Sequence, residues 1–238
     1  MMRINPMGAL VGGMLLCASS QSSFAQSALV EDVTGKAAGV DFMDYVDTGK
    51  IIRLGQRDSM VLSYIQSCVQ ETIKGGTVTI GTEQSDVVGG RVDRAKVDCD
   101  ASKMMQTPKN MSQAAGVVFR GMGPKPGAGT SGAAPKPDLN PQFTLYGLSP
   151  IVQVNGTGEL VIERLDKQDE PPVKVMVGQD QLMKGAFFDC ATKGISLVGG
   201  GIYRASWGTR HTVFKVDSSA KSGRSPIIGR LVKLVPAT

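Results

Sequence analysis

Ser206 and His211 are the one pair of side chains in this sequence whose types and spacing could support nucleophilic catalysis. His211 is the only histidine among 238 residues. If the chain turns back between them, the imidazole lies across a hairpin from the hydroxyl and can accept its proton. The sequence shows no third group to orient the histidine and no G-x-S-x-G nucleophile turn. We therefore interpret both as surface residues of strands, and we predict no catalytic residue.

Two other features suggest ligand chemistry. Asp41, Asp44 and Asp47 are three residues apart, whereas a calcium loop places its carboxylates at alternate residues around a glycine. The run 199-GGG-201 could cradle a phosphate, but this needs a following helix or a Lys-Ser/Thr pair. The next residues, 202-IYRASW-207, are typical of a strand instead. We predict no metal site and no cofactor, and we assign the glycines to a bend.

A hairpin would position Ser206 and His211. Gly208-Thr209 fits a two-residue type II′ turn, because glycine stands first. Ser206 then faces His211 on the wetter face. Three pairs share the opposite, largely apolar face: Trp207 with Arg210, Ala205 with Thr212, and Tyr203 with Phe214. We expect Arg210 to lie over the Trp207 ring.

Residues 142–238 predict a β sandwich of the immunoglobulin kind, because short strand candidates follow one another between turns. These candidates are 143–147, 150–155, 159–165, 172–178, 185–190, 195–198, 202–207, 211–216 and 226–234. Leu197 and Tyr203, separated by 198-VGGGI-202, resemble the tyrosine corner of fibronectin type III and immunoglobulin-like domains. The resemblance implies that the Tyr203 hydroxyl bonds to nearby backbone. Leu197, Tyr203, Trp207 and Phe214 are the predicted structural residues.

Residues 29–101 predict a small β domain, with strand candidates at 29–35, 50–55, 60–65, 77–81 and 90–99. The segment 66–76 fits either a strand or a helical turn. The stretch 44-DYVDTGKIIRLGQRDSMVLSYIQ-66 resembles the small β domains of FecR-type periplasmic proteins. The acidic start and the cysteines depart from that pattern. The resemblance implies an envelope-facing sensory or scaffold role and carries over no catalytic residue.

The segment 102–141 is predicted to be a linker between these two domains. Residues 121–141 hold five prolines, five glycines and three alanines. Such a composition cannot bury enough apolar surface to offset the entropy of ordering. The whole chain is therefore predicted to be all-β, with a small N-terminal β domain, a Pro/Gly linker and a C-terminal sandwich.

Residues 1–25 are predicted to be a secretory signal peptide. The apolar run 7–18 is too short to span a bilayer, and small residues Ser23 and Ala25 precede the expected cleavage point. A retained anchor is the alternative. A lipid attachment at Cys17 is disfavoured, because Leu16 stands where a small residue is required. The sequence thus predicts a periplasmic or secreted protein with no transmembrane segment after signal removal.

Export leaves Cys68, Cys99 and Cys190. In an oxidising compartment two of the three are expected to pair. We predict a disulfide between Cys68 and Cys99, since both lie in one compact region, and its closure is worth about 3–4 kcal/mol. Cys190 lies in the apolar run 186-AFFDC-190 and is predicted to be a buried, inert thiol.

Charge is uneven along the chain. Residues 29–101 hold 8 basic and 12 acidic side chains, residues 102–141 hold 5 and 1, and residues 142–238 hold 12 and 8. The basic part could face an anionic wall or membrane surface. Nucleic acid is not expected as a partner, because no aromatic-interleaved basic strip or helix-turn-helix pattern is present.

These observations favour an exported, non-enzymatic envelope binding or scaffold protein, which meets an envelope protein or an anionic surface. A FecR-like signalling component is the first alternative. A wall-polymer hydrolase that uses Ser206 and His211 is the second.

Overall fold

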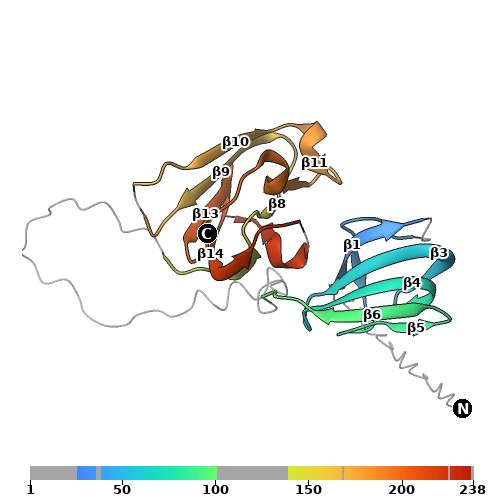
Figure 1. Cartoon of the computed structure of the whole chain (residues 1–238). Helices are drawn as coiled ribbons and strands as arrows, with labels where there is room; N and C mark the ends of the chain where they lie inside the picture. The colour runs from blue at the N-terminus through green and yellow to red at the C-terminus, as the bar shows by residue number, and fades with distance from the viewer. Residues whose placement is uncertain (1–25, 36–38, 101–138, 168, 225, 237–238) are drawn as a thin grey trace, which may run out of the picture.

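A computed structural model describes residues 26–35, 39–100, 139–167, 169–224 and 226–236. The expectation of an all-β fold is confirmed: the described residues form strands, turns and three short 3-10 helices. Two units lie beside each other, the first blue to green and the second yellow to red (Figure 1). The predicted signal peptide lies outside the described residues, as does most of the predicted linker.

The first unit is a single six-stranded sheet. Its strands are β1 (Gln26–Thr34), β2 (Tyr45–Asp47), β3 (Ile51–Tyr64), β4 (Val69–Thr79), β5 (Asp86–Val88) and β6 (Arg91–Lys96). The order is β2-β1-β3-β4-β5, and β6 also pairs with β4. The two strands expected at 50–55 and 60–65 are one long strand, β3, whose register against β4 shifts between Leu54 and Ser59. The undecided segment 66–76 belongs largely to strand β4.

The second unit is a two-sheet sandwich. Its strands are β7 (Thr144–Gly147), β8 (Ile151–Gln153), β9 (Gly158–Arg164), β10 (Val173–Val177), β11 (Leu182–Met183), β12 (Phe187–Asp189), β13 (Ile202–Trp207), β14 (Arg210–Lys221), β15 (Leu231–Lys233) and β16 (Val235–Pro236). The 3-10 helices are η1 (Gln179–Gln181), η2 (Cys190–Lys193) and η3 (Ile228–Arg230).

The strand order of the sandwich follows a Greek-key pattern. One sheet has the order β10-β9-β13-β14-β16, with β7 parallel to β14, and the other has the order β11-β12-β8-β15. Strands β8 to β14 have the order expected for an immunoglobulin-like sandwich with one extra strand beside its third strand, whereas β7, β15 and β16 depart from it.

Two of the expected strands in the second unit differ in type from the structure over part or all of their length. Residues 195–198 are not a strand, because η2 and the left-handed Gly194 (φ 68°) redirect the chain just before them. The candidate at 226–234 begins with η3, and only Leu231–Lys233 pairs, in parallel with β8. Both errors arise where a short apolar run does not reveal whether it forms a strand or a tight turn.

The hairpin β13–β14 has the register expected from sequence. Trp207 faces Arg210 and Ser206 faces His211, and the turn residue Gly208 has a φ of 56°. The expected placement of Arg210 over the Trp207 ring is wrong. The Arg210 guanidinium donates instead to the carbonyl of Leu234, which fixes the hairpin tip to the end of the chain.

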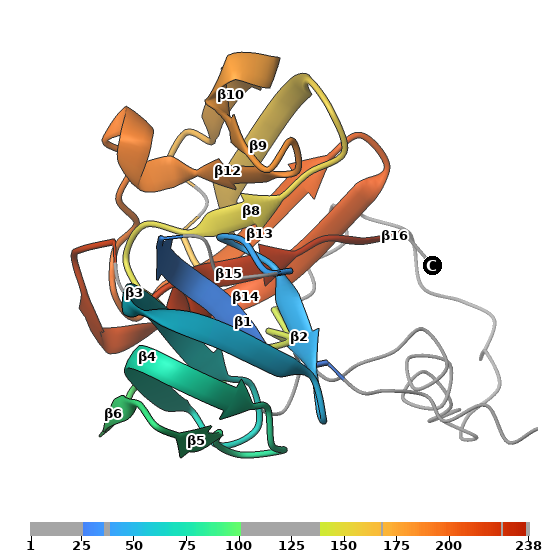
Figure 2. The ribbon, with the colours of Figure 1, turned by 90° about the vertical axis from the view of Figure 1, so that its right-hand side faces the viewer.

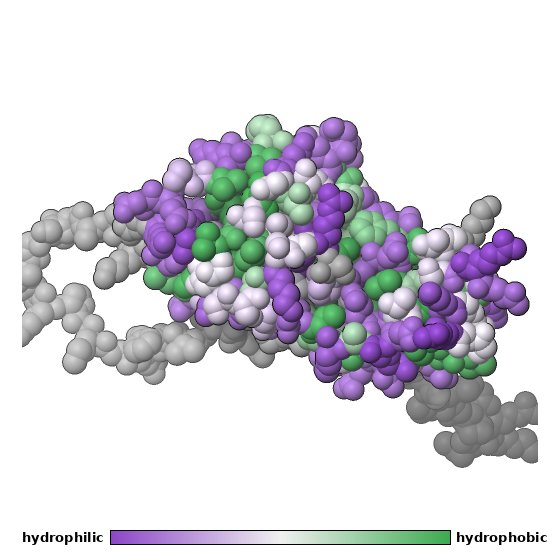
Figure 3. Space-filling view, in the orientation of Figure 1, coloured by the Kyte–Doolittle hydropathy of each residue, from purple (hydrophilic) through white to green (hydrophobic). Residues whose placement is uncertain are grey.

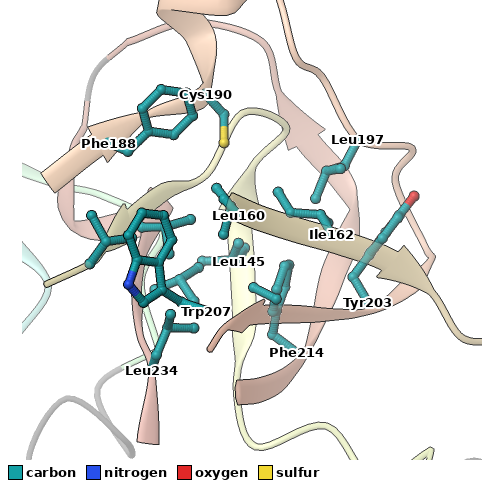
Figure 4. Close-up of a cluster of buried hydrophobic side chains, with 14 of the residues drawn as sticks. Leu145, Leu160, Ile162, Phe188, Cys190, Leu197, Tyr203, Trp207, Phe214 and Leu234 are labelled. Carbon is teal, nitrogen blue, oxygen red and sulfur yellow. The ribbon is translucent and has the colours of Figure 1, made fainter. Parts of the chain in front are cut away.

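The tyrosine corner geometry is present at the start of β13. The Tyr203 hydroxyl accepts a hydrogen bond from the Val198 N–H at 2.9 Å and lies 3.2 Å from the Val198 carbonyl. Gly200 turns the chain with a φ of 82°. Leu197, Tyr203, Trp207 and Phe214 lie in the core between the two sheets, together with Cys190 (Figure 4).

A disulfide joins Cys68 and Cys99, whose Cα atoms are 5.7 Å apart. Cys68 follows β3, and Cys99 lies just beyond β6. The Val97 N–H also donates to the Cys68 carbonyl at 2.9 Å. The bridge therefore fixes the point at which the chain leaves the first unit.

The two units share a hydrophobic cluster. Its buried members from the first unit are Leu29 and Met43, and those from the second are Ile151, Phe187, Ile227 and Leu231. Phe42, Tyr45, Met183 and Ala186 pack against them. The two units also lie side by side when the molecule is turned (Figure 2). Because apolar side chains of both units exclude water here, the junction is part of the folded core.

Replacing Tyr203 by phenylalanine tests the corner. The ring remains, but the Val198 N–H loses its acceptor, and we expect the free energy of unfolding to fall by about 1 kcal/mol. Urea denaturation followed by the fluorescence of the single tryptophan measures this. Tyr146→Phe, at a half-buried tyrosine of β7, is the control, and an equal loss in both variants would contradict the assignment.

Candidate functional site: a groove between the two β units

The structure places Ser206 and His211 opposite each other, but on the outer face of a sheet. They are partners in the register of β13 and β14, and both are half-buried. Among the described residues, no hydrogen bond links the hydroxyl to the imidazole and no carboxylate bonds to His211. The neighbouring partner of His211 is Val235 of β16, an apolar residue. A nucleophile without an oriented base gains no activation from this arrangement.

Asp41, Asp44 and Asp47 do not come together as the ligands of a metal ion among the described residues. Lys184 of the second unit lies 2.8 Å from Asp41 Oδ2 and 3.3 Å from Asp44 Oδ1. Asp47 ends β2, away from this ion pair. Within the described ranges, no three histidine, cysteine or acidic side chains gather as metal ligands. The pair Asp41 and Asp44 therefore serves as an ionic contact between the units.

Lys184 holds the Asp41 carboxylate in its charged form. The hydrogen bond from Lys184 is the main cause that lowers the pKa of Asp41, and Asp41 in turn raises the pKa of Lys184. The Asp41 side chain is 66% exposed and the Lys184 side chain 34%, so solvent screens the interaction. The stability that this ion pair contributes is fully present above the ordinary pKa of an aspartate. It is lost as the pH falls through the lowered pKa that Asp41 has in the folded protein.

Cys190 is the free cysteine of the described residues, and it is buried. Burial raises the pKa of its thiol to about 12. The thiolate is the reactive form of cysteine. Cys190 is therefore a packing residue of the core in Figure 4 rather than a nucleophile.

Glu31 is the charged residue at the centre of the junction. It lies in β1 and is only 6% exposed, yet both of its carboxylate oxygens have partners. Oε1 accepts the backbone N–H of Ile228 in the second unit at 2.8 Å, and Oε2 accepts the Gln70 side chain at 2.8 Å. A buried carboxylate is tolerated only with such partners. This residue therefore couples the fold of the first unit to helix η3 of the second.

Arg230 forms a second buried ionic centre, on the side of the second unit. Its side chain is 2% exposed and pairs with Asp189. Its Nε donates to the Ser149 carbonyl at 2.6 Å and its Nη1 to the Arg224 carbonyl at 2.6 Å. Asp189 also accepts the Ala191 N–H at 3.0 Å and so begins η2. The guanidinium thus connects the end of β12 with two loops at the junction.

The first unit approaches this region closely. The Thr144 N–H donates to Asp100 at 2.9 Å, just beyond the disulfide. A Cβ atom at Gly229 would stand 2.7 Å from the Asp98 carbonyl oxygen, so a glycine is needed for this approach. On the opposite side of the junction, Lys233 Nζ lies 4.4 Å from the centre of the Tyr45 ring.

A groove of about 440 Å³ lies between the two units. The first unit contributes Glu31, Asp32, Phe42 and Val61, and the second contributes Ile151, Met183, Asp189, Thr192, Arg224, Ile227 and Arg230. Its wall is mainly apolar, and Glu31, Asp189 and Arg230 are committed to internal bonds. Ligand sites typically have this volume, this apolar lining and this position between structural units.

Two opposite charges remain at the groove. Asp32 and Arg224 are exposed, and neither side chain forms an ion pair within the described residues. An occupant with an apolar part and an anionic or cationic end could therefore contact both the wall and one of these charges. A smaller cavity of about 170 Å³ lies on the other side of Arg230, lined by residues that include Lys96, Asp98 and Lys221.

Sequence reasoning did not identify Glu31, Asp189 or Arg230 as important. The signal was available, because Glu31 stands in 28-ALVEDV-33 and Arg230 in 227-IIGRLV-232. A charge flanked by apolar residues in a strand run indicates a buried group that needs a partner. The partner itself is distant in sequence and could not be named.

Comparisons with known proteins give no information on function, so any proposal has to be argued from the structure. No protein-family model, no curated protein and no solved structure matches this chain. In the described part of the chain, no helix has the length and apolarity needed to cross a membrane. The comparisons add no support to the resemblances to FecR-type and fibronectin type III domains.

Replacing Glu31 by glutamine tests the junction. The amide can no longer accept from both the Ile228 N–H and the Gln70 side chain, and we expect a loss of about 1–3 kcal/mol in the free energy of unfolding. Hydrogen exchange at the Ile228 amide should accelerate in the same variant. Glu83→Gln, at an exposed loop residue, is the matched control. An unchanged Ile228 exchange rate in Glu31→Gln would contradict the role given to this carboxylate.

Replacing Lys184 by methionine tests the ionic contact. The pKa of Asp41 should rise toward its ordinary value of 3.8, because the main cause of its lowering is removed. Any loss of stability should appear above that pH and vanish in strong acid. An NMR titration of the aspartate side chains measures the pKa, with Lys193→Met as control. An Asp41 pKa that does not move would show that Lys184 is not its partner in solution.

Proposed function

We propose that this chain is an exported, non-enzymatic envelope binding protein that holds its ligand in the groove between its two β units. The observation that carries the proposal is the composition of that groove. Its buried charges are all hydrogen-bonded within the protein, while its apolar wall remains open. A general acid or base needs a titratable group free to exchange a proton with substrate, and Glu31 and Asp189 are held by protein donors. Asp32 is the one free carboxylate among the described groove residues, and it has no second free carboxylate or histidine beside it in the lining, so the groove is better suited to binding.

Export is supported by two independent features. The first 25 residues have the pattern of a secretory signal. The bond between Cys68 and Cys99 is of the kind that persists in an oxidising compartment. A periplasmic or secreted protein that binds an envelope component fits both features. The exposed Asp32 and Arg224 favour a ligand that is apolar in part and charged at one end, such as a segment of an envelope protein or an anionic amphiphile.

A groove-filling variant tests the proposal with a defined probe. An anilinonaphthalene sulfonate dye joins an aromatic part to an anionic group, and its fluorescence rises in apolar sites. We expect saturable binding of one dye per chain, weakened at least about tenfold by Thr192→Trp, because the indole would occupy the groove. Thr192→Ala removes the same hydroxyl without filling the groove and should bind as the original protein does. Equal binding by both variants, or no saturable binding, would overturn the proposal.

The hydrolase alternative is separated by a second measurement. Cell-wall fragments are incubated with the original protein and with His211→Ala, and released fragments are quantified. We expect no release by either protein. Hydrolysis by the original protein that His211→Ala abolishes, while its unfolding midpoint is unchanged, would replace the binding proposal with an enzymatic one.

A further inference from the structure

The edge strand β10 has an unpaired side. It pairs with β9 through Val173 to Val177, and it ends the sheet β10-β9-β13-β14-β16. It lies at the top of both Figure 1 and Figure 2, on the side of the second unit that faces away from the first. The groove residues are all elsewhere, so this edge is independent of the proposed ligand site.

The composition of β10 is unusual for an exposed edge. Folded proteins usually protect such edges with charge, since free N–H and C=O groups can pair with another chain. The other long free edge, β6, follows this rule, because four of its six residues are charged: Arg91, Asp93, Arg94 and Lys96. Hydrophilic side chains gather over that lower region of the first unit in Figure 3. By contrast, β10 reads VKVMV and carries one charge.

The two faces of β10 differ. Val175 and Val177 point to the sandwich core. Lys174 and Met176 point outward, and Met176 is 70% exposed, the most exposed of the large hydrophobic side chains in the described residues. Val173, at the start of the strand, is 38% exposed. An occupant of this edge would therefore gain both backbone hydrogen bonds and apolar contact.

We propose that β10 pairs with β10 of a second copy of this chain, antiparallel and about a two-fold axis at Val175. The two sheets then continue into one another across the dimer. In this register Val173 faces Val177 of the second copy, and Lys174 faces Met176 of the second copy. All five residues of the strand are paired, and each face of the joined sheet keeps its own character.

Charge complementarity favours the second copy as occupant. In β9 the partner of Met176 is Glu159, an exposed residue. In the joined sheet, Met176 would lie between Glu159 of its own chain and Lys174 of the second copy. The long lysine side chain can therefore cover Met176 and reach the Glu159 carboxylate. Within the described residues neither Lys174 nor Glu159 has an ion-pair partner in the same chain. The dimer supplies one to each.

Other registers fit less well. An axis at Lys174 would place two lysines directly opposite each other, which destabilises paired strands. It would also draw Pro171 and Pro172 into the ladder, although a proline cannot donate a backbone hydrogen bond. An axis at Met176 would pair only three residues of each strand, Val175 to Val177. The axis at Val175 avoids both problems.

A charge substitution and its rescue test the dimer. Met176→Lys places a lysine opposite Lys174 of the second copy, twice per dimer, and we expect the dissociation constant to rise at least about tenfold by sedimentation velocity. The double variant K174E/M176K restores opposite charges and should return it to within about threefold of the original value. Val88→Lys, at another exposed apolar residue on strand β5, should leave it unchanged.

The outcomes decide the proposal. Circular dichroism verifies that each variant is folded. A chain that stays monomeric up to millimolar concentration would overturn the dimer, and would leave an extended segment of another protein as the candidate occupant of the edge. A dimer that Met176→Lys does not weaken would place the interface elsewhere.

Cysteine crosslinking tests the register independently. In the proposed pairing Val175 faces Val175 of the second copy, at a separation that a disulfide can span. Val175→Cys should therefore form a covalent dimer under mild oxidation. Met176→Cys, although more exposed, should form far less, because the two residues at 176 are offset. Equal or greater crosslinking at 176 would contradict the axis at Val175.

Discussion

The carboxylate of Glu31 and the backbone N–H of Ile228 form the bond on which the arrangement of this molecule depends. A buried charge is costly unless hydrogen bonds replace the lost water. One oxygen is satisfied inside the first unit by Gln70, and the other is satisfied across the junction. If the units separated, Glu31 would lose that partner and the shared apolar cluster would be exposed. The energy of the junction therefore comes from apolar burial, and its geometry is set by the carboxylate.

The same network determines what the groove can do. Glu31, Asp189 and Arg230 line it, yet their polar atoms are bonded to the protein, so they fix its shape. Two reactive side chains lie outside the groove: Cys190 is buried, and His211 lies on an open sheet face. What remains accessible is an apolar wall beside Asp32 and Arg224. The proposed binding role rests on this division between committed and free groups.

Residue patterns over short stretches of sequence predicted the all-β class and the pairing within one hairpin. The β13–β14 register followed from alternation about Gly208, and the all-β class from short runs between turns. The bridge between Cys68 and Cys99 followed from their shared region. The junction could not be predicted, because Glu31 and Ile228 are 197 positions apart and Arg230 resembles an ordinary strand residue. The expected strand at 195–198 failed because η2 and Gly194 turn the chain first, an effect that apolar periodicity does not encode.

A distance measurement between the units tests the central claim, that they form one body, most directly. Spin labels on cysteines introduced at Glu83 and Lys193, both exposed and in different units, report that distance by pulsed electron resonance in a Cys190→Ala background. A pair at Glu83 and Arg91, within the first unit, gives the reference width. We predict one distance across the junction, with a distribution as narrow as the reference. A broad distribution, as from units joined only by a chain, would contradict the shared junction and the groove that it forms.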